Sequence, residues 1–152
     1  MGFRIRETMS GRHEFAPDMG PPGRHPFAFH LRWGPDRLTD WLNPLGEQFL
    51  WQEVHGEVEV SGLCERTPCS GTLSLDYFRG RRIRYAFDFE VDGVAYRFSG
   101  EKSNLRPWNL AVTHTTCFGT LVELGSGKLV STSVTEFKLR DLPRFVCSLR
   151  WA

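Results

Sequence analysis

The side chains best suited to proton transfer lie between positions 100 and 115. Glu101 and Lys102 follow an alternating, strand-like segment, so we expect them at the mouth of a β-structure, where they can bind a carboxylate or an enolate-like oxygen. His114 lies beside two threonines, and an imidazole titrates near neutral pH, as a general acid or base must. These three are the candidate catalytic groups if the protein is an enzyme. The alternatives are a rim ion pair of little energy and an ordinary barrel or surface histidine.

A second group of candidates lies in the segment 11–25, which contains three prolines and is predicted to be irregular. A loop of this length in a compact domain often carries function. We predict either a rigid flap over a barrel mouth, with His13, Arg24 or His25 facing a ligand, or a structural loop wrapped on the outside.

The sequence contains none of the usual motifs for a metal site, a cofactor site or a catalytic nucleophile. The five histidines do not share the i, i+4 or i, i+2 spacing of a local metal site, and Cys64 and Cys69 lack the second cysteine pair of a zinc site. Neither a nucleophile elbow nor a phosphate-binding glycine motif occurs. We therefore expect no metal and no cofactor. The four cysteines are expected to be thiols, although Cys64 and Cys69 could close a small disulfide in an exported protein.

Aromatic side chains are abundant, with 12 Phe, 5 Trp and 3 Tyr. Tyr85, Phe87, Tyr96 and Phe98 stand at alternate positions of two successive segments, and Trp108 follows in a polar stretch. These residues predict either a packed core or the lining of an apolar pocket with two hydroxyl groups.

Strands must position most of these side chains, because apolar residues recur at every second position. The clearest signal is Asp92-Gly93 between two alternating runs, which is typical of a tight hairpin. The predicted strands cover about 3–9, 26–33, 51–61, 73–77, 83–91, 94–98, 111–123 and 129–139. Segments 11–25, 62–71 and 101–109 are predicted to be loops.

Two short helices complete the expected fold. Leu38, Trp41 and Leu42 follow Asp36 at helical spacing and predict a short helix or capping loop over 35–42, which would act as a lid. Apolar residues at helical spacing after Asp141 predict a C-terminal helix over 141–151. Residues 1–152 therefore form one all-β, mainly antiparallel domain, either an eight-stranded barrel or a two-sheet sandwich, and the run of hairpins favours the barrel.

The charge and hydropathy of the chain argue against two classes of partner, nucleic acids and membranes. The formal net charge is +1 and no run of like charges occurs, so a nucleic-acid binder is not expected. No segment approaches the roughly 20 apolar residues of a membrane span, and the first residues do not form a signal peptide. We expect a cytoplasmic protein.

Several short motifs, distributed mostly after residue 50, resemble a lipocalin-like, calycin-like accessory domain of bacterial cholesterol oxidase-like proteins in the glucose-methanol-choline (GMC) oxidoreductase family. They are Glu7-Thr8-Met9-Ser10-Gly11, Gly56 to Val60, Gly71 to Leu75, Arg84-Tyr85 to Phe89, Asp92-Gly93 to Tyr96, Gly100-Glu101-Lys102, Trp108, Thr115-Thr116 and Leu142 to Leu149. The resemblance implies a barrel working near lipid or sterol chemistry. The flavin domain is missing, so the oxidase activity does not carry over.

Three functions follow from these observations. The first is binding of an apolar small molecule, such as a lipid, sterol, isoprenoid or polyketide-like compound, lined by Tyr85, Phe87, Tyr96, Phe98 and Trp108 with His25 and Arg24 at the mouth. The second is a cofactor-free isomerase or cyclase acting in the same cavity. The third is an interaction module, with a separate oxidoreductase or a second copy of the chain as partner.

Overall fold

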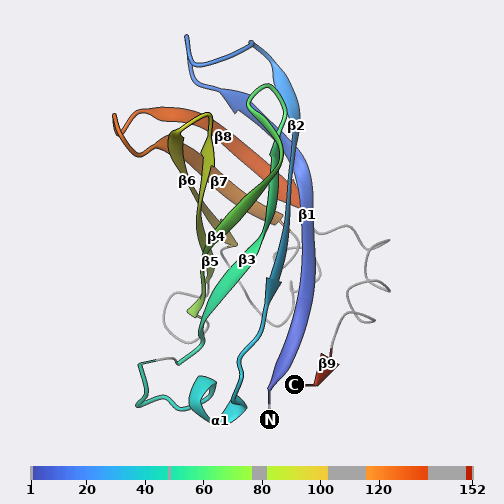
Figure 1. Cartoon of the computed structure of the whole chain (residues 1–152), viewed down its shortest axis with the longest axis vertical. Coiled ribbons are helices and arrows are strands. Elements are labelled where there is room, and N and C mark those ends of the chain that lie inside the picture. The colour runs from blue at the N-terminus through green and yellow to red at the C-terminus, as the bar shows by residue number, and fades with distance from the viewer. Residues whose placement is uncertain (1, 48, 77–81, 103–115, 137–149, 152) are drawn as a thin grey trace.

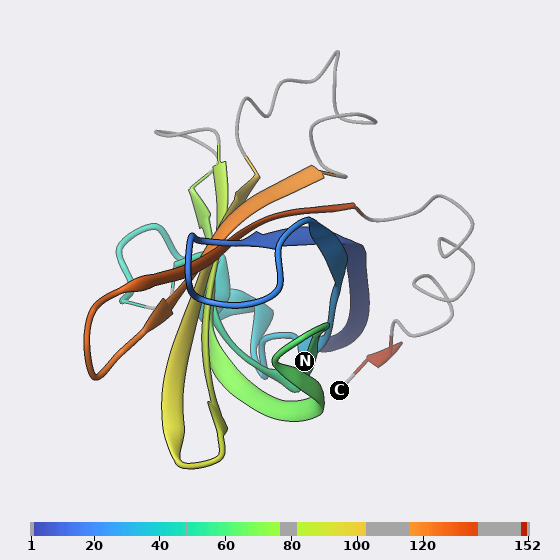
Figure 2. The same ribbon diagram turned by 90° about the horizontal axis from the view of Figure 1, so that it is seen from above.

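The computed structural model of the chain describes residues 2–47, 49–76, 82–102, 116–136 and 150–151, and it confirms the all-β barrel. The strands are β1 (Phe3–Phe15), β2 (Arg24–Trp33), β3 (Trp51–Val60), β4 (Cys64–Asp76), β5 (Arg82–Val91), β6 (Val94–Lys102), β7 (Thr116–Glu123), β8 (Leu129–Glu136) and β9 (Arg150–Trp151). From β1 to β8 each strand pairs antiparallel with the next, and β8 returns to β1 (Figures 1 and 2). That returning ladder closes an eight-stranded barrel and decides against the two-sheet sandwich.

The closing strand, β1, has different partners along its length. Its ladder with β2 runs from Ile5 to Glu14, while its ladder with β8 covers only Ser10 to Phe15. The short β9 pairs with the first two residues of β1. Within the described part of the chain, positions 5–9 of β1 therefore have a ladder partner on the β2 side alone.

Two predicted loops are too long because glycines within strands resemble strand ends. The loop predicted over 11–25 covers only 16–23, since β1 continues to Phe15 and β2 starts at Arg24. The loop predicted over 62–71 is shorter still, since β4 starts at Cys64 instead of after Gly71. A Cβ at Gly11 would lie 2.0 Å from the carbonyl oxygen of Val134, and one at Gly71 would lie 1.9 Å from that of Ala86. These glycines mark close backbone approach between strands, not chain reversal.

The predicted Asp92-Gly93 hairpin is confirmed. Asp92 has φ 51° and Gly93 has φ 81°, the positive values that a type I′ turn requires at both central positions. The turn connects β5 to β6 with Val91 paired to Val94. It therefore fixes the register that places alternate aromatic side chains inside the barrel.

The predicted helices are less accurate than the strands. A four-residue helix α1 (Leu38–Trp41) lies where the lid was expected, but its N-cap is Arg37, and Asp36 forms an ion pair with Arg4 instead of capping. The proposed C-terminal helix falls largely on residues 137–149, outside the described residues. Its last two residues, Arg150 and Trp151, are strand β9, because they pair with β1. Within its described part, the chain has no helix with the length and apolar character needed to cross a bilayer.

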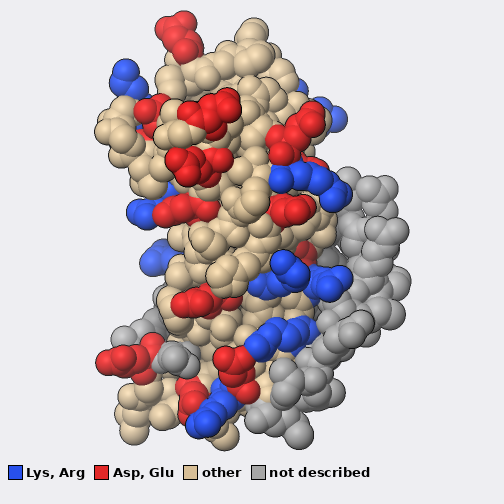
Figure 3. Space-filling view, in the orientation of Figure 1, with Lys and Arg blue, Asp and Glu red and all other residues tan. Residues whose placement is uncertain are grey.

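Inward and outward positions alternate along the strands, as the sequence predicts, except at Val130 and Ser131 of β8, which are both buried beside a register shift. The outer face carries cross-strand ion pairs, such as Arg97 to Asp88 at 2.8 Å, and acidic and basic side chains are interspersed over the face shown in Figure 3. The inner face holds the core, whose fully buried large side chains are Phe27, Phe29, Phe87, Phe98, Met9, Leu31, Leu73 and Leu121, together with His13, Val54 and Val58.

Candidate functional site

An aromatic belt fills the middle of the barrel. Phe87 and Phe98 are stacked with ring centroids 4.8 Å apart, and Phe29 lies 5.4 Å from each of them. Phe27 adds a fourth ring, 5.4 Å from Phe98. The belt separates the interior into an upper end, which carries the β1–β2 loop, and a lower end, which carries the N-terminus and α1 (Figure 1). Phe87 and Phe98, predicted as pocket lining or core, belong to this belt.

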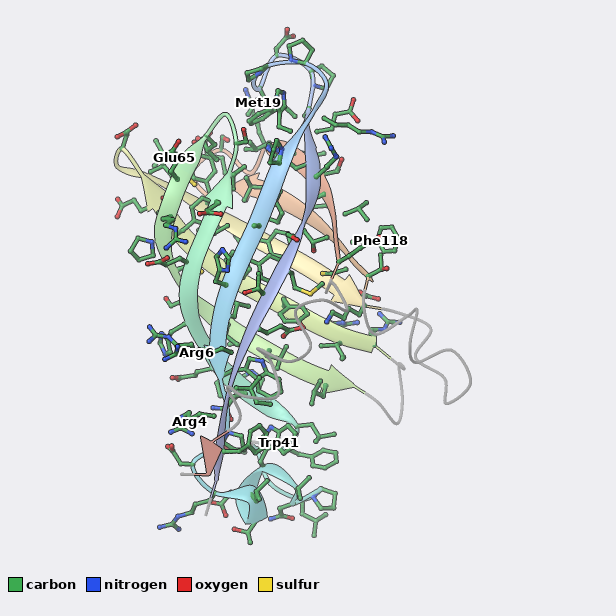
Figure 4. The ribbon with its side chains drawn as sticks, turned by 90° about the vertical axis from the view of Figure 1, so that its right-hand side faces the viewer. Arg4, Arg6, Met19, Trp41, Glu65 and Phe118 are labelled. Atoms are coloured by element: carbon green, nitrogen blue, oxygen red, sulfur yellow. The ribbon has the colours of Figure 1, made fainter. Side chains whose placement is uncertain are left out.

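The upper end is closed by His13 and Phe15. His13 is 2% exposed, and its Nε2 contacts the carbonyl oxygen of Ser61 at 2.8 Å, which links β1 to the β3–β4 turn. Burial lowers the pKa of His13, the hydrogen bond to Ser61 opposes that shift, and His25 adds to it. The ring of Phe15 lies beside Gly20 and Gly62, so the adjacent loops pack directly on it. Met19 lies in this end of the molecule and Trp41 in the opposite one (Figure 4).

A buried charged cluster lies inside the lower end. Lys102 Nζ donates to Glu7 Oε1 at 2.9 Å, and the Tyr85 hydroxyl lies 3.1 and 3.0 Å from the two oxygens of the same carboxylate. Lys102 is 3% exposed and Glu7 is 7% exposed. We call Glu7, Tyr85 and Lys102 the interior triad.

The triad joins three strands that lie far apart in sequence. Glu7 comes from β1, Tyr85 from β5 and Lys102 from the last position of β6. Lys102 Nζ also lies 5.4 Å from the centroid of the Tyr85 ring, within the range of a cation–π contact. Burial raises the pKa of Tyr85 well above its usual value, and the neighbouring Glu7 raises it further, so the phenol stays protonated and serves as a donor.

Apolar side chains surround the triad. In the sheet register Glu7 faces Leu31, Tyr85 faces Leu73, and Lys102 faces Ile83, and all three aliphatic side chains are buried. Cys117 is also buried, and burial raises its pKa to about 12 against the opposing effect of Lys102. The charges therefore lie in an environment of low polarity, where removing either partner is costly.

The other predicted site residues are dispersed. Glu101 belongs to β6 and not to a loop, and alternation places it on the outer face, 3.6 Å from Arg82 and 3.9 Å from Arg84. Arg24 is exposed, and His25 Nε2 lies 3.1 Å from the Pro21 and Pro22 carbonyl oxygens at the upper end. Tyr96 is half-buried and stacks on Phe89, above the belt. Trp108 and His114 lie outside the described residues.

Sequence reasoning missed Glu7, although the sequence contained a signal for it. Phe3, Ile5 and Met9 mark the inner face of β1, and Glu7 is in phase with them. A carboxylate at an inward position of an otherwise apolar face requires a partner inside the fold. Lys102 meets that need, in phase with Phe98 on β6.

The remaining features that could mark a functional site within the described residues are a surface groove and the cysteines. A shallow groove of about 390 Å³ lies outside the barrel beside α1, lined by Pro35, Asp36, Arg37, Asp40, Trp51, Gln52 and Glu53. No three metal-ligating side chains gather within the described residues. Cys64, Cys69 and Cys117 are free thiols.

Comparisons with protein-family models, curated proteins and solved structures find no match to this chain.

Proposed function

We propose that the lower end of the barrel binds an apolar small molecule that carries a polar oxygen, such as a sterol, isoprenoid, lipid or polyketide-like compound. The supporting observation is the interior triad. A buried ion pair is no better for stability than well-packed hydrophobic side chains, so its presence in a barrel interior favours a role in recognition. Apolar walls with a few convergent polar groups are also typical of small-molecule sites.

The architecture favours the lower end over the upper one. The aromatic belt blocks passage through the barrel, and the upper end is filled by His13 and Phe15. The polar side chains of the interior triad, by contrast, lie at the lower end. An ammonium group has three donors, and the contact with Glu7 uses one, so a ligand oxygen can accept another.

Ligand displacement tests the proposal. The full chain is loaded with the fluorescent apolar probe anilinonaphthalene sulfonate, which is then displaced with dodecanol or with dodecane. We expect both to displace the probe and dodecanol to bind more tightly. Lys102→Met should remove most of this preference, roughly tenfold in affinity, because the charged donor is lost.

Lys128→Met is the matched control, because Lys128 is exposed at the upper end between β7 and β8. Its dodecanol preference should equal that of the wild type. Failure of both dodecanol and dodecane to displace the probe, with no apolar compound recovered from the purified protein by solvent extraction, would overturn the proposal.

A cofactor-free isomerase or cyclase in the same site is the second candidate. Tyr85 and Lys102 both donate to one carboxylate, so a proton can pass between Glu7 and a bound substrate beside a cationic group. His114 and Glu101 would assist only if the substrate reaches them. Recovery of a chemically altered ligand after incubation distinguishes this enzyme from a binding protein.

The third candidate, an interaction module, has a specific observation on the outer face. Phe118 is 58% exposed and is paired in register with Val134, which is 44% exposed. Phe118 projects from the barrel in Figure 4. This pair is the candidate contact for an oxidoreductase or a second copy of the chain, and Phe118→Ser would weaken such an assembly in sedimentation experiments.

A further inference from the structure

Lysine is rare in this chain, and one lysine is inside the barrel. Three of the 19 basic residues are lysines, at positions 102, 128 and 138, and the rest are arginines. Among the described residues the buried cation is Lys102, whereas the charged arginines lie on the surface. A guanidinium is always charged, but an amine can lose its proton and act as a nucleophile. The residue type inside the barrel therefore permits a covalent reaction that arginine would prevent.

The surroundings of Lys102 fit such a reaction. The Glu7 carboxylate, 2.9 Å from Nζ, is positioned to accept the proton that the amine must lose before it attacks. Leu31 and Ile83 supply apolar surface beside the two charged groups. Tyr85 holds the carboxylate through its hydroxyl, which remains a donor.

We propose that Lys102 forms a reversible imine with an apolar aldehyde or ketone bound at the lower end, with Glu7 as the proton acceptor and counter-ion. The proposal rests on the proposed ligand-binding function and adds the chemical class of the ligand, a carbonyl compound.

The reaction balances without an oxidant, reductant or cofactor. Glu7 takes a proton from the Lys102 ammonium, and the neutral amine attacks the carbonyl carbon. The former carbonyl oxygen then takes a proton from the attacking nitrogen, which gives a neutral carbinolamine. Loss of that oxygen as water, with a proton returned from Glu7, forms the carbon–nitrogen double bond. The net change converts one ammonium and one carbonyl group into one protonated imine and one water.

Charge pairing in the interior is conserved through this change. The protonated imine carries the same single positive charge as the ammonium, and it stays beside the same carboxylate. The product therefore does not leave Glu7 buried without a cationic partner, which would be costly in an apolar setting. A lysine paired with a solvent-exposed carboxylate would not gain this advantage.

Reductive trapping tests the proposal. The full chain is incubated with dodecanal and sodium cyanoborohydride, which reduces an imine to a stable secondary amine, and the adduct is located by intact mass and peptide mapping. We expect one adduct per chain, on Lys102. Lys102→Arg should abolish it and Lys128→Arg should not, while Glu7→Gln should slow its formation about 100-fold.

Measurements on the wild type keep the test independent of whether the variants fold. Excess dodecanol, which has the same chain but no carbonyl group, should protect Lys102 from dodecanal. Equal labelling of Lys102, Lys128 and Lys138, labelling without protection by dodecanol, or no adduct at all would each overturn the imine. Displacement of the fluorescent probe by dodecanol remains a separate readout, so the imine can be rejected while the binding function stands.

Discussion

The ring of Phe98 on β6 occupies the space that Gly119 leaves open on β7. A Cβ at Gly119 would lie 2.4 Å from Cε2 of Phe98 and 3.0 Å from Oγ of Ser133. Gly100, the other inward glycine of this wall, lies against the same ring. The aromatic belt therefore depends on two positions without side chains as much as on the rings themselves.

Gly119→Ala should destabilise the barrel by about 1–3 kcal/mol, because the added methyl group overpacks the core. Urea denaturation measures the effect, and Gly125→Ala is the control, since the nearest atom to its added Cβ would be Glu123 Oε1 at 3.9 Å. The double variant Gly119→Ala, Phe98→Leu should lose less stability than the sum of its single changes. Additive losses would show that the ring and the glycine are independent.

Removing one member of the interior ion pair should cost more than removing both. Glu7→Leu leaves Lys102 buried without its carboxylate, and we expect a loss of about 3–5 kcal/mol in the free energy of unfolding. The double variant Glu7→Leu, Lys102→Met should recover most of that loss. A double-mutant cycle in urea measures the coupling, and Arg97→Met with Asp88→Leu, an exposed pair, should show far weaker coupling than the interior pair.

Stability should decrease at acidic pH partly because of His13. Burial lowers its pKa in the folded barrel below the value near 6.5 of the unfolded chain. The unfolded state then binds the proton more readily than the folded state. The stability that neutral His13 contributes is therefore fully present above about pH 6.5, and it is lost as the pH falls toward the lowered pKa of the folded state. The loss approaches about 1.4 kcal/mol per pH unit between the two pKa values.

The variant His13→Phe should flatten this part of the pH profile, measured by urea denaturation from pH 8 to pH 5. His55→Phe is the control, because the His55 side chain is 64% exposed. An unchanged profile in His13→Phe would assign the acid sensitivity to other groups.

Thiol labelling should follow burial. Burial raises the pKa of Cys69 and of Cys117 to about 12, and both side chains are enclosed, whereas Cys64 is only half-buried. In the native protein, N-ethylmaleimide should modify Cys64 well before Cys69 or Cys117, and denaturant should expose all three. Peptide mapping by mass spectrometry measures the order, and early labelling of Cys117 would contradict the closed interior seen at β7.

The hydrophobic alternation predicts the strands because strand faces repeat with a period of two, and the Asp92-Gly93 turn predicts the central hairpin. Alternation alone does not separate a barrel from a sandwich, and the run of hairpins is what favours the barrel. Strand ends were harder to predict. Gly11 and Gly71 are of a residue type common in loops, yet they lie inside β1 and β4. The reason is visible only in the structure, where neighbouring strands approach their backbones closely.

The candidate site was partly predictable. Lys102 and Tyr85 were named from their own segments, but Glu7 lies 95 residues from Lys102, and pairing across that separation is decided by barrel closure. Glu101 and Lys102 are adjacent in sequence, but neighbouring residues of a strand point to opposite faces, so only Lys102 enters the interior.

The closing ladder between β1 and β8 pairs Ser10 with Glu136. During synthesis on the ribosome, β1 emerges long before β8. The edge of β1 that pairs with β8 therefore stays unpaired while about 120 residues are added. Contacts between distant parts of a chain also form slowly. The nascent chain therefore presents an incomplete sheet until the last barrel strand leaves the exit tunnel, and chaperone demand should be greatest in that interval.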